Sequence, residues 1–251
     1  MSSSLPVNNF RYFAKIVPYP GNPITSNTTI YFPGQYILVV AVGAGGAGGG
    51  TGADVCYAGD GGDTVVTNSY QSIIAGGGVG GESGSYAIDP YGLGGAGGIG
   101  SVSNVQYYQI LHGNPGGSGN YNYGGSGAAI PTGYISAIKK VLGDIGSPTT
   151  IPLNIQSIPG TNSSAGSGYG AGGGGNSGAS GNGGGGGGSG AVVVALMSGG
   201  TFNITVAPLN TQITTCAGYR NPSYAYGMPG VVYLFQITPC NLNAVKFPNF
   251  F

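Results

Sequence analysis

Glycine is concentrated in a few parts of this chain. Of the 56 glycines among 251 residues, 42 fall in four blocks: seven in 43–52, twelve in 76–100, seven in 113–127 and sixteen in 166–190. The last block contains six consecutive glycines, Gly183 to Gly188, which run almost directly into the apolar stretch Val192–Val194. Such blocks are either flexible linkers between folded parts or ordered structure in their own right.

The composition of the blocks argues against linkers. Flexible linkers carry Ser, Thr, Pro or charged residues and few apolar ones, whereas these blocks also hold Val79, Leu93 and Ile99. Four long linkers would also divide the chain into pieces of one or two strands, none of which could build a core alone. We therefore expect the glycine blocks to lie inside the fold.

Glycine allows one particular kind of ordered packing. Without a Cβ atom, extended chains approach each other closely, and a polyproline II helix turns once every three residues with its backbone groups pointing outward. Neighbouring glycine helices of this kind can hydrogen-bond side by side. Apolar burial must then come from the rest of the chain.

The segments between the blocks read as strands. They are short, β-branched or aromatic, and end at Gly, Pro or Asn, which predicts an all-β background. The expected strands are 36–42, 63–68, 72–75, 102–111, 191–196, 201–207 and 230–237. One segment, 133–143, instead places Ile135, Ile138 and Val141 on one helical face and ends at Gly143, so it predicts a short helix.

Five stretches together resemble the glycine-rich domain of virion proteins, which occurs in adhesins at the tips of bacteriophage long tail fibres and in structural proteins of large DNA viruses. They are GQYILVVAVGAGGAGGG, AGDGGDTVVTNSYQSIIAGGGVGG, HGNPGGSGNYNYGGSG, GGGGGGSGAVVVAL and PGVVYLFQI. The resemblance implies an all-β, polyglycine fold in which a sandwich of glycine-rich polyproline II helices stands on a small β-sheet scaffold. It also implies display on a virus particle, binding loops at one end and a trimeric homo-oligomer. We expect this domain at 31–238, an N-terminal docking segment at 1–30 and an aromatic tail at 239–251.

Charge and hydropathy limit the partners. The chain has six basic and six acidic residues and no net charge, which argues against a nucleic-acid partner because binding to phosphates needs a basic surface. Lys139 and Lys140 form the only basic pair, and the apolar runs are too short to cross a bilayer, so no membrane insertion is expected. The N-terminal residues have no signal-peptide pattern. We expect synthesis in a host cytosol and localisation to the virion.

Two motifs that could indicate catalysis lack their context. Gly43-x-Gly45-x-x-Gly48 follows a strand as a dinucleotide-binding motif would, but no helical pattern follows it to receive a pyrophosphate. The single histidine, His112, has no recognisable nucleophile or orienting acid near it in the sequence. We therefore expect no enzyme activity and no cofactor.

Acidic and sulfur side chains are expected to be structural. Asp60-Gly-Gly-Asp63 resembles part of a calcium loop but lacks a third acid, so the more common role of such Asp residues, accepting backbone N–H bonds in a turn, is favoured over a metal site. The cysteines Cys56, Cys216 and Cys240 match no metal or redox spacing and predict buried, reduced thiols.

Tyrosine is the residue type best suited to binding. The chain has 18 tyrosines and no tryptophan, and two Tyr-rich loops resemble antibody-type contact loops, although their rings could also only cap the glycine layers. The candidate residues for binding a receptor or partner are Tyr121, Tyr123, Tyr219, Arg220, Tyr224 and Tyr226. Candidate assembly anchors are Phe10, Tyr12, Phe13, Phe247, Phe250 and Phe251, which would dock on neighbouring subunits or fold back over a sheet edge.

These features favour a non-enzymatic virion structural protein that attaches to a host receptor, a glycan or a protein, or to neighbouring virion subunits. A minor capsid or cement protein that stabilises the particle is the first alternative. An extracellular or ice-binding glycine-rich protein is the second.

Overall fold

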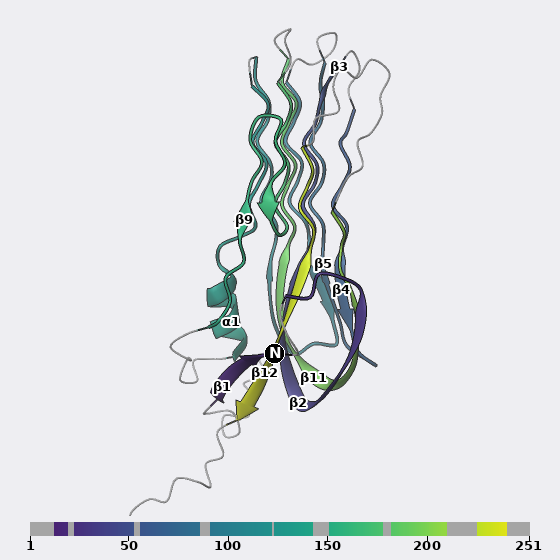
Figure 1. The fold of residues 1–251 in the computed structure, drawn as a ribbon, viewed down its shortest axis with the longest axis vertical. Helices are drawn as coiled ribbons and strands as arrows, with labels where there is room; N and C mark the ends of the chain where they lie inside the picture. The colour runs from purple at the N-terminus through teal and green to yellow at the C-terminus, as the bar shows by residue number, and fades with distance from the viewer. Residues whose placement is uncertain are drawn as a thin grey trace, which may run out of the picture.

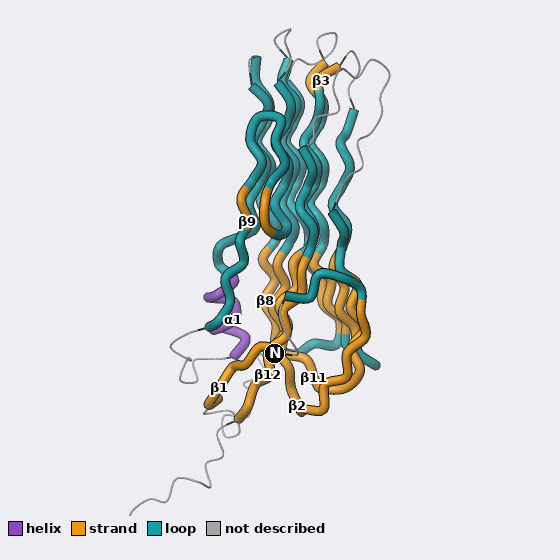
Figure 2. Tube along the Cα trace, in the orientation of Figure 1, coloured by secondary structure: helices purple, strands orange, loops and turns teal. Residues whose placement is uncertain are grey.

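The fold has a β-sheet at one end and long glycine-rich segments that run from the sheet to the other end (Figures 1 and 2). This computed structural model describes residues 13–19, 23–52, 56–85, 91–121, 123–142, 151–177, 182–209 and 225–239. The described part is mostly β-structure with one short helix, as the sequence predicts.

Eight strands form the main sheet, and most of its pairs join distant parts of the chain. These strands are β1 (Phe13–Pro18), β2 (Thr28–Val42), β4 (Thr64–Thr67), β5 (Ser72–Ala75), β7 (Ser101–Ser103), β8 (Tyr107–Leu111), β11 (Val192–Thr205) and β12 (Val231–Pro239). They are antiparallel in the order β1-β12-β2-β11-β4-β5-β7, and β8 also pairs with β11. Two small sheets pair β3 (Thr51–Gly52) with β6 (Gly84–Ser85), and β9 (Ser157–Ile158) with β10 (Ser167–Gly168).

The long strand β11 lets the sheet change neighbours along its length. Its first half, from Val192 to Leu196, pairs with β8, and its last residues, Asn203 to Thr205, pair with β4. Between the two halves the register shifts next to Gly200, whose φ of +136° is a conformation that glycine adopts without strain. The sheet therefore curls, and its β4-β5-β7 part covers one face of β2 and β11 (Figure 1).

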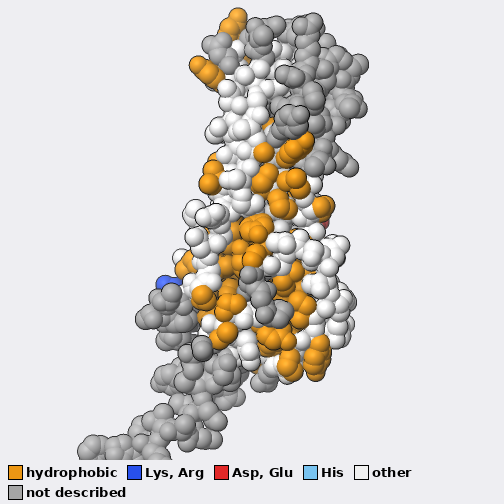
Figure 3. Space-filling model, in the orientation of Figure 1, with side chains coloured by type: hydrophobic (Ala, Val, Ile, Leu, Met, Phe, Trp, Pro, Cys, Tyr) orange, Lys and Arg blue, Asp and Glu red, His pale blue; other side chains and the backbone are white. Residues whose placement is uncertain are grey.

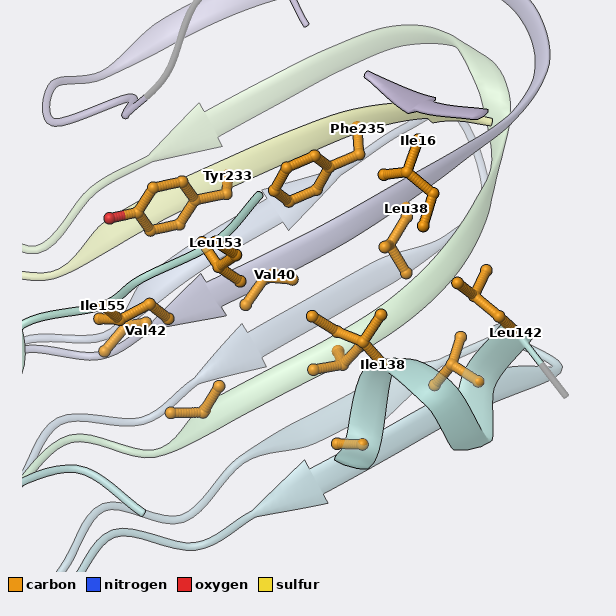
Figure 4. Close-up of a cluster of buried hydrophobic side chains, with 14 of the residues drawn as sticks. Ile16, Leu38, Val40, Val42, Ile138, Leu142, Leu153, Ile155, Tyr233 and Phe235 are labelled. Atoms are coloured by element: carbon orange, nitrogen blue, oxygen red, sulfur yellow. The ribbon is translucent and has the colours of Figure 1, made fainter. Parts of the chain in front are cut away.

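The central strands are buried on both faces. One face of β2 packs Leu38, Val40 and Val42 into a cluster with helix α1 (Tyr134–Leu142), as Figure 4 shows. The opposite face packs Ile37, Val39 and Ala41 against the curled part of the sheet. Burial on both faces explains why these strands are continuous apolar runs instead of alternating ones. Within the first cluster, burial raises the pKa of Tyr233 to about 12.

Helix α1 confirms the predicted helical segment. Its residues Ile138, Val141 and Leu142 are buried against the sheet, and Lys139 and Lys140 are exposed. The helix has nine residues. In the part of the chain that the structure describes, no helix is long and apolar enough to cross a membrane.

The predicted strands are present, with two changes. The expected strand 102–111 is divided into β7 and β8 by a turn at Asn104, which has a φ of +56°. The expected strands 191–196 and 201–207 belong to one strand, β11, because Ser198 to Gly200 form an irregularity within it and not a loop. In addition, Phe13–Pro18 forms β1, which covers the edge of β12.

The strands of the sheet lead directly into a bundle of glycine-rich segments, which we call the glycine bundle (Figure 2). Its segments are 43–50, 56–62, 76–84, 91–100, 112–121, 123–130, 170–177, 182–191 and 225–230. They hydrogen-bond to each other through backbone N–H and C=O groups and are not regular strands. The prediction that the glycine blocks lie inside the fold is therefore confirmed.

A three-residue repeat governs the hydrogen bonds of the bundle. In segment 43–49, the N–H groups of Gly43, Gly46 and Gly49 all donate to segment 185–191. Those of Ala44 and Ala47 donate to segment 59–62, and those of Gly45 and Gly48 to segment 225–228. Each third residue of this segment thus faces the same neighbour.

The six-glycine run forms the centre of the bundle. We call 183–191 the central segment; every residue from Gly184 to Ala191 donates its backbone N–H to another segment. The central segment bonds to six neighbours, which are 43–49, 76–82, 92–98, 114–117, 125–128 and 170–176. Each of these neighbours is also hydrogen-bonded to the next in that order, and 170–176 to 43–49, so they form a closed ring.

The close packing explains why the central segment is glycine. A Cβ atom placed on any residue from Gly184 to Gly188 would overlap a backbone carbonyl of a ring segment. Among the described glycines, positive φ values occur at Gly168, Gly170 and Gly200, none of which lies in the central segment. Glycine is therefore required here for its missing side chain and not for a left-handed conformation.

On the outside of the bundle, aspartates occupy hydrogen-bonding positions. The Asp60 carboxylate accepts from the Gly80 N–H at 2.8 Å, and the Asp63 carboxylate accepts from the Gly77 N–H at 3.0 Å. Asp60 and Asp63 therefore accept backbone hydrogen bonds, as favoured from the sequence, but the donors lie in a neighbouring segment and not in a local turn.

Replacing both Asp60 and Asp63 with alanine is expected to lower the free energy of unfolding by about 1–3 kcal/mol, because two charge-assisted hydrogen bonds at a partly exposed site are lost. Denaturant unfolding followed by circular dichroism measures the change. The matched control replaces both residues with asparagine, which keeps an acceptor oxygen and should lose less. Equal losses in the two double variants would contradict this role.

Candidate binding surface at the far end of the glycine bundle

Four tyrosines from four segments lie at the end of the bundle farthest from the sheet. They are Tyr57, Tyr91, Tyr121 and Tyr123, which we call the tip tyrosines. Tyr57 is bridged to Glu82, and Tyr91 to Gly183. The Gly119 N–H donates to the Gly92 carbonyl, so Gly119 lies beside Gly92. Tyr121, two residues after Gly119, therefore lies near Tyr91 at the far end of the bundle.

The tip tyrosines are exposed. The exposed fractions are 62% for Tyr57, 43% for Tyr91, 63% for Tyr121 and 60% for Tyr123. Large aromatic side chains gain much from burial, so a group of them in solvent is a typical feature of a contact surface.

A turn positions two of these tyrosines. The backbone N–H of Asn120 donates to the Tyr123 carbonyl, and the Tyr123 N–H donates to the Asn120 side-chain oxygen, both at 2.9 Å. Asparagine favours such turns because its side chain mimics a backbone acceptor. The closed turn places Tyr121 and Tyr123 close together at the ends of two adjacent segments.

The structure brings together only some of the predicted site residues. Tyr121 and Tyr123 are both at the tip, whereas Tyr226 is half-buried in segment 225–230. Tyr219, Arg220 and Tyr224 lie outside the described residues. Of the predicted assembly anchors, Phe13 has its backbone in β1, paired with Pro239. Phe10, Tyr12, Phe247, Phe250 and Phe251 also lie outside the described residues.

Sequence reasoning missed Tyr57 and Tyr91. Each lies at the start of a glycine-rich segment that begins at the far end of the bundle and runs toward the sheet. The signal available in the sequence was a tyrosine at the boundary of two glycine-rich segments, which also applies to Tyr121 and Tyr123. The prediction instead used local Tyr density, which Tyr57 and Tyr91 lack.

Cys56, next to Tyr57, corrects the prediction of reduced thiols. Its side chain is buried and disulfide-bonded. Its backbone N–H donates to the Ser83 hydroxyl at 2.7 Å, and its carbonyl accepts from the Ser83 N–H at 2.6 Å. The composition-based prediction failed because it judged cysteine number and spacing, whereas pairing depends on which distant segments the fold brings together.

The described surface has few groups suited to acid–base or metal chemistry. In the described ranges, no group of three or more His, Cys, Asp or Glu side chains could hold a metal ion. His112 is exposed at the sheet end of segment 112–121, far from the tip tyrosines along that segment. On the face shown in Figure 3, hydrophobic side chains are common and charged ones are few. Comparison with protein-family models, curated proteins and solved structures found no match.

Proposed function

We propose that this chain is a non-enzymatic structural protein of a virion, in which a stiff glycine bundle carries a tyrosine-rich attachment surface away from a β-sheet base. Its partners are other virion proteins and a surface receptor of the host, and it acts as a homo-oligomer. The observation that carries the proposal is the closed ring of six hydrogen-bonded segments around residues 183–191, with exposed tyrosines at its far end.

The finer fold proposal is that the bundle segments are polyproline II helices in a sandwich. The three-residue repeat of hydrogen-bond partners along segment 43–49 supports it. Backbone chemical shifts and scalar couplings measured by NMR should then give φ near about −75° and ψ near about +145° along 183–188. Strand-like values near φ of about −140° would reject it.

The bundle suits a spacer that has to hold its shape. Each residue of the central segment is fixed by bonds to neighbours in several directions, so the segment cannot bend without breaking bonds to several neighbours. The tip combines Tyr with Asn, Ser and Gly, a composition that gives large contact area with adaptable hydrogen bonds. Enzymatic function would instead require paired acids, a nucleophile or a metal at such a surface.

Replacing both Tyr121 and Tyr123 with alanine is expected to slow adsorption of virus particles to host cells at least about tenfold, because the contact area of two exposed aromatic side chains is lost. The measurement is the adsorption rate of particles carrying the variant. Tyr31→Ala is the matched control, because Tyr31 is equally exposed but lies in the sheet.

Electron microscopy of labelled particles distinguishes attachment from the minor capsid or cement alternative. An attachment protein should present the tip tyrosines outward. Normal adsorption of the double variant, together with a tip buried between capsid proteins, would reject the attachment function.

A further inference from the structure

We propose that a groove on the outside of the glycine bundle binds an extended, glycine-rich segment of a partner protein. The groove, which we call the open groove, lies between ring segments 92–98 and 114–117. It presents unpaired backbone N–H and C=O groups, and an equivalent groove elsewhere in the bundle is filled by residues 225–228. The partner segment hydrogen-bonds to the open groove as 225–228 does to its own, and so adds one more segment to the bundle.

Segments 43–49 and 92–98 occupy equivalent positions in the ring. They lie on the two sides of segment 76–82, which donates backbone hydrogen bonds to both. Both donate to the central segment from every third residue; these residues are Gly43, Gly46 and Gly49 in the first and Gly92, Gly95 and Gly98 in the second. A Cβ atom on Gly46 or on Gly95 would overlap the same backbone carbonyl. The two segments therefore have matching sets of inward-facing and outward-facing groups.

The outward groups of the first segment are covered by residues 225–228. The N–H groups of Gly45 and Gly48 donate to carbonyls of this outer segment, each at 2.9 Å. In return, the Met228 N–H donates at 2.8 Å to the carbonyl of Ala171, which belongs to the next ring segment. Gly45, Gly48 and Ala171 are all buried. A filled groove between two ring segments is the result.

The donors of the open groove have no partner. By their place in the three-residue repeat, Gly94 and Gly97 are the counterparts of Gly45 and Gly48. Among the described residues, neither the Gly94 N–H nor the Gly97 N–H makes a hydrogen bond. Both glycines are half-buried, whereas their counterparts are buried. The open groove therefore offers two free donors, three residues apart.

The other side of the open groove offers an acceptor. A Cβ atom on Gly94 would overlap the Gly116 carbonyl, just as a Cβ atom on Gly45 would overlap the carbonyl of Ala171. Gly116 is therefore the counterpart of Ala171, and no N–H group in the described part of the chain donates to its carbonyl. As at the edge of a sheet, exposed unpaired backbone groups are a template for pairing with another chain, and main-chain hydrogen bonds supply the affinity.

The filled groove indicates the chemistry of the partner segment. Gly227 of the outer segment faces the ring, and a Cβ atom there would overlap the Gly45 carbonyl. The partner segment therefore needs glycine at the corresponding position and an extended backbone that presents carbonyls three residues apart. Exposed Leu93, Ile99 and Pro115 border the open groove along its two segments, and neither they nor the glycines between them carry a charge. An uncharged segment matches this lining, because a charged one would lose hydration without gaining a partner.

An NMR titration of the intact, ¹⁵N-labelled chain tests the open groove. The probe is the acetylated and amidated peptide Ala-Tyr-Gly-Met-Pro-Gly, which is the sequence of 225–230. The amide signals of Gly94 and Gly97 should shift with half-saturation near about 1 mM, because only a few hydrogen bonds hold so short a segment. The matched control peptide, Ala-Tyr-Ala-Met-Pro-Gly, should bind at least about tenfold more weakly, because its Cβ atom meets backbone. The double variant Leu93→Asn with Ile99→Asn changes only exposed side chains and should weaken binding of the first peptide.

Four results would overturn the proposal. The first is no shift of Gly94 and Gly97 up to about 10 mM peptide, and the second is equal binding of both peptides. The third is a shift of Gly45 and Gly48 alone, which would mean that the peptide displaces residues 225–228. The fourth is exchange protection of the Gly94 and Gly97 amides that rises with the concentration of the chain alone, which would mean that a second copy fills the groove. No virus particle enters the experiment, so its outcome is independent of the proposed attachment function.

Discussion

Replacing Gly186 with alanine is expected to lower the free energy of unfolding by about 3 kcal/mol, the upper part of the range for overpacking. Gly186 is in the middle of the central segment, and a Cβ atom there would overlap the carbonyl oxygen of Ser126. The obstacle is backbone, which cannot rotate away as a side chain can. To relieve the overlap, either segment must move and break hydrogen bonds such as that from the Gly186 N–H to Gly117. Denaturant unfolding and thermal melting measure the loss.

Gly62→Ala is the matched control for this prediction. Gly62 belongs to the same bundle, but a Cβ atom there would be in ordinary contact, 3.4 Å from Ala207. Since alanine restricts the unfolded chain more than glycine does, this variant should be unchanged or more stable by up to about 1 kcal/mol. If both variants unfold at the same denaturant concentration, the central segment is not closely packed and the proposed stiff spacer is wrong.

Leu234→Ala is expected to destabilise the protein by about 2–5 kcal/mol. Leu234 lies in β12 opposite Val39 of β2, and its side chain is fully buried in the second hydrophobic cluster. β12 and its neighbour β2 are both covered on both faces, so the surrounding side chains can collapse only partly into the space that is left. The measurement is the free energy of unfolding in denaturant.

The control for Leu234 is the same substitution at an exposed leucine. Leu93 is on the outside of the glycine bundle with 60% of its surface exposed. Leu93→Ala should change the free energy of unfolding by no more than about 0.5 kcal/mol. A similar loss in both variants would mean that Leu93 is buried in an assembly, whereas a negligible loss for Leu234 would contradict the packing of the sheet.

The sequence predicts the β-sheet well because its local pattern and its tertiary role agree. The apolar run 36–42 is predicted as a strand and lies in β2 of the structure, and its continuous hydrophobicity correctly indicates burial on both faces. The glycine blocks could be placed inside the fold, since their apolar residues are unlike those of linkers. The ring around 183–191 could not be predicted, because which segments become neighbours is decided by hydrogen bonds between backbones that have nearly the same sequence.

The candidate site was only partly predictable for a related reason. Tyr121 and Tyr123 stand out as a local cluster, but Tyr57 and Tyr91 join them only because separate segments end at the same level. The disulfide of Cys56 was missed because a covalent bond between distant segments leaves no trace in local spacing.

The direction of the hydrogen bonds in the bundle has a mechanical consequence. The segments run along the long axis, so the bonds between them lie across it (Figure 1). Tension applied between the tip and the sheet would load the bonds of a segment in shear, all at the same moment, and would not open them one after another. A protein built in this way should resist extension until many hydrogen bonds break together. This resistance matters for a protein that is attached at one end and bound by a partner at the other.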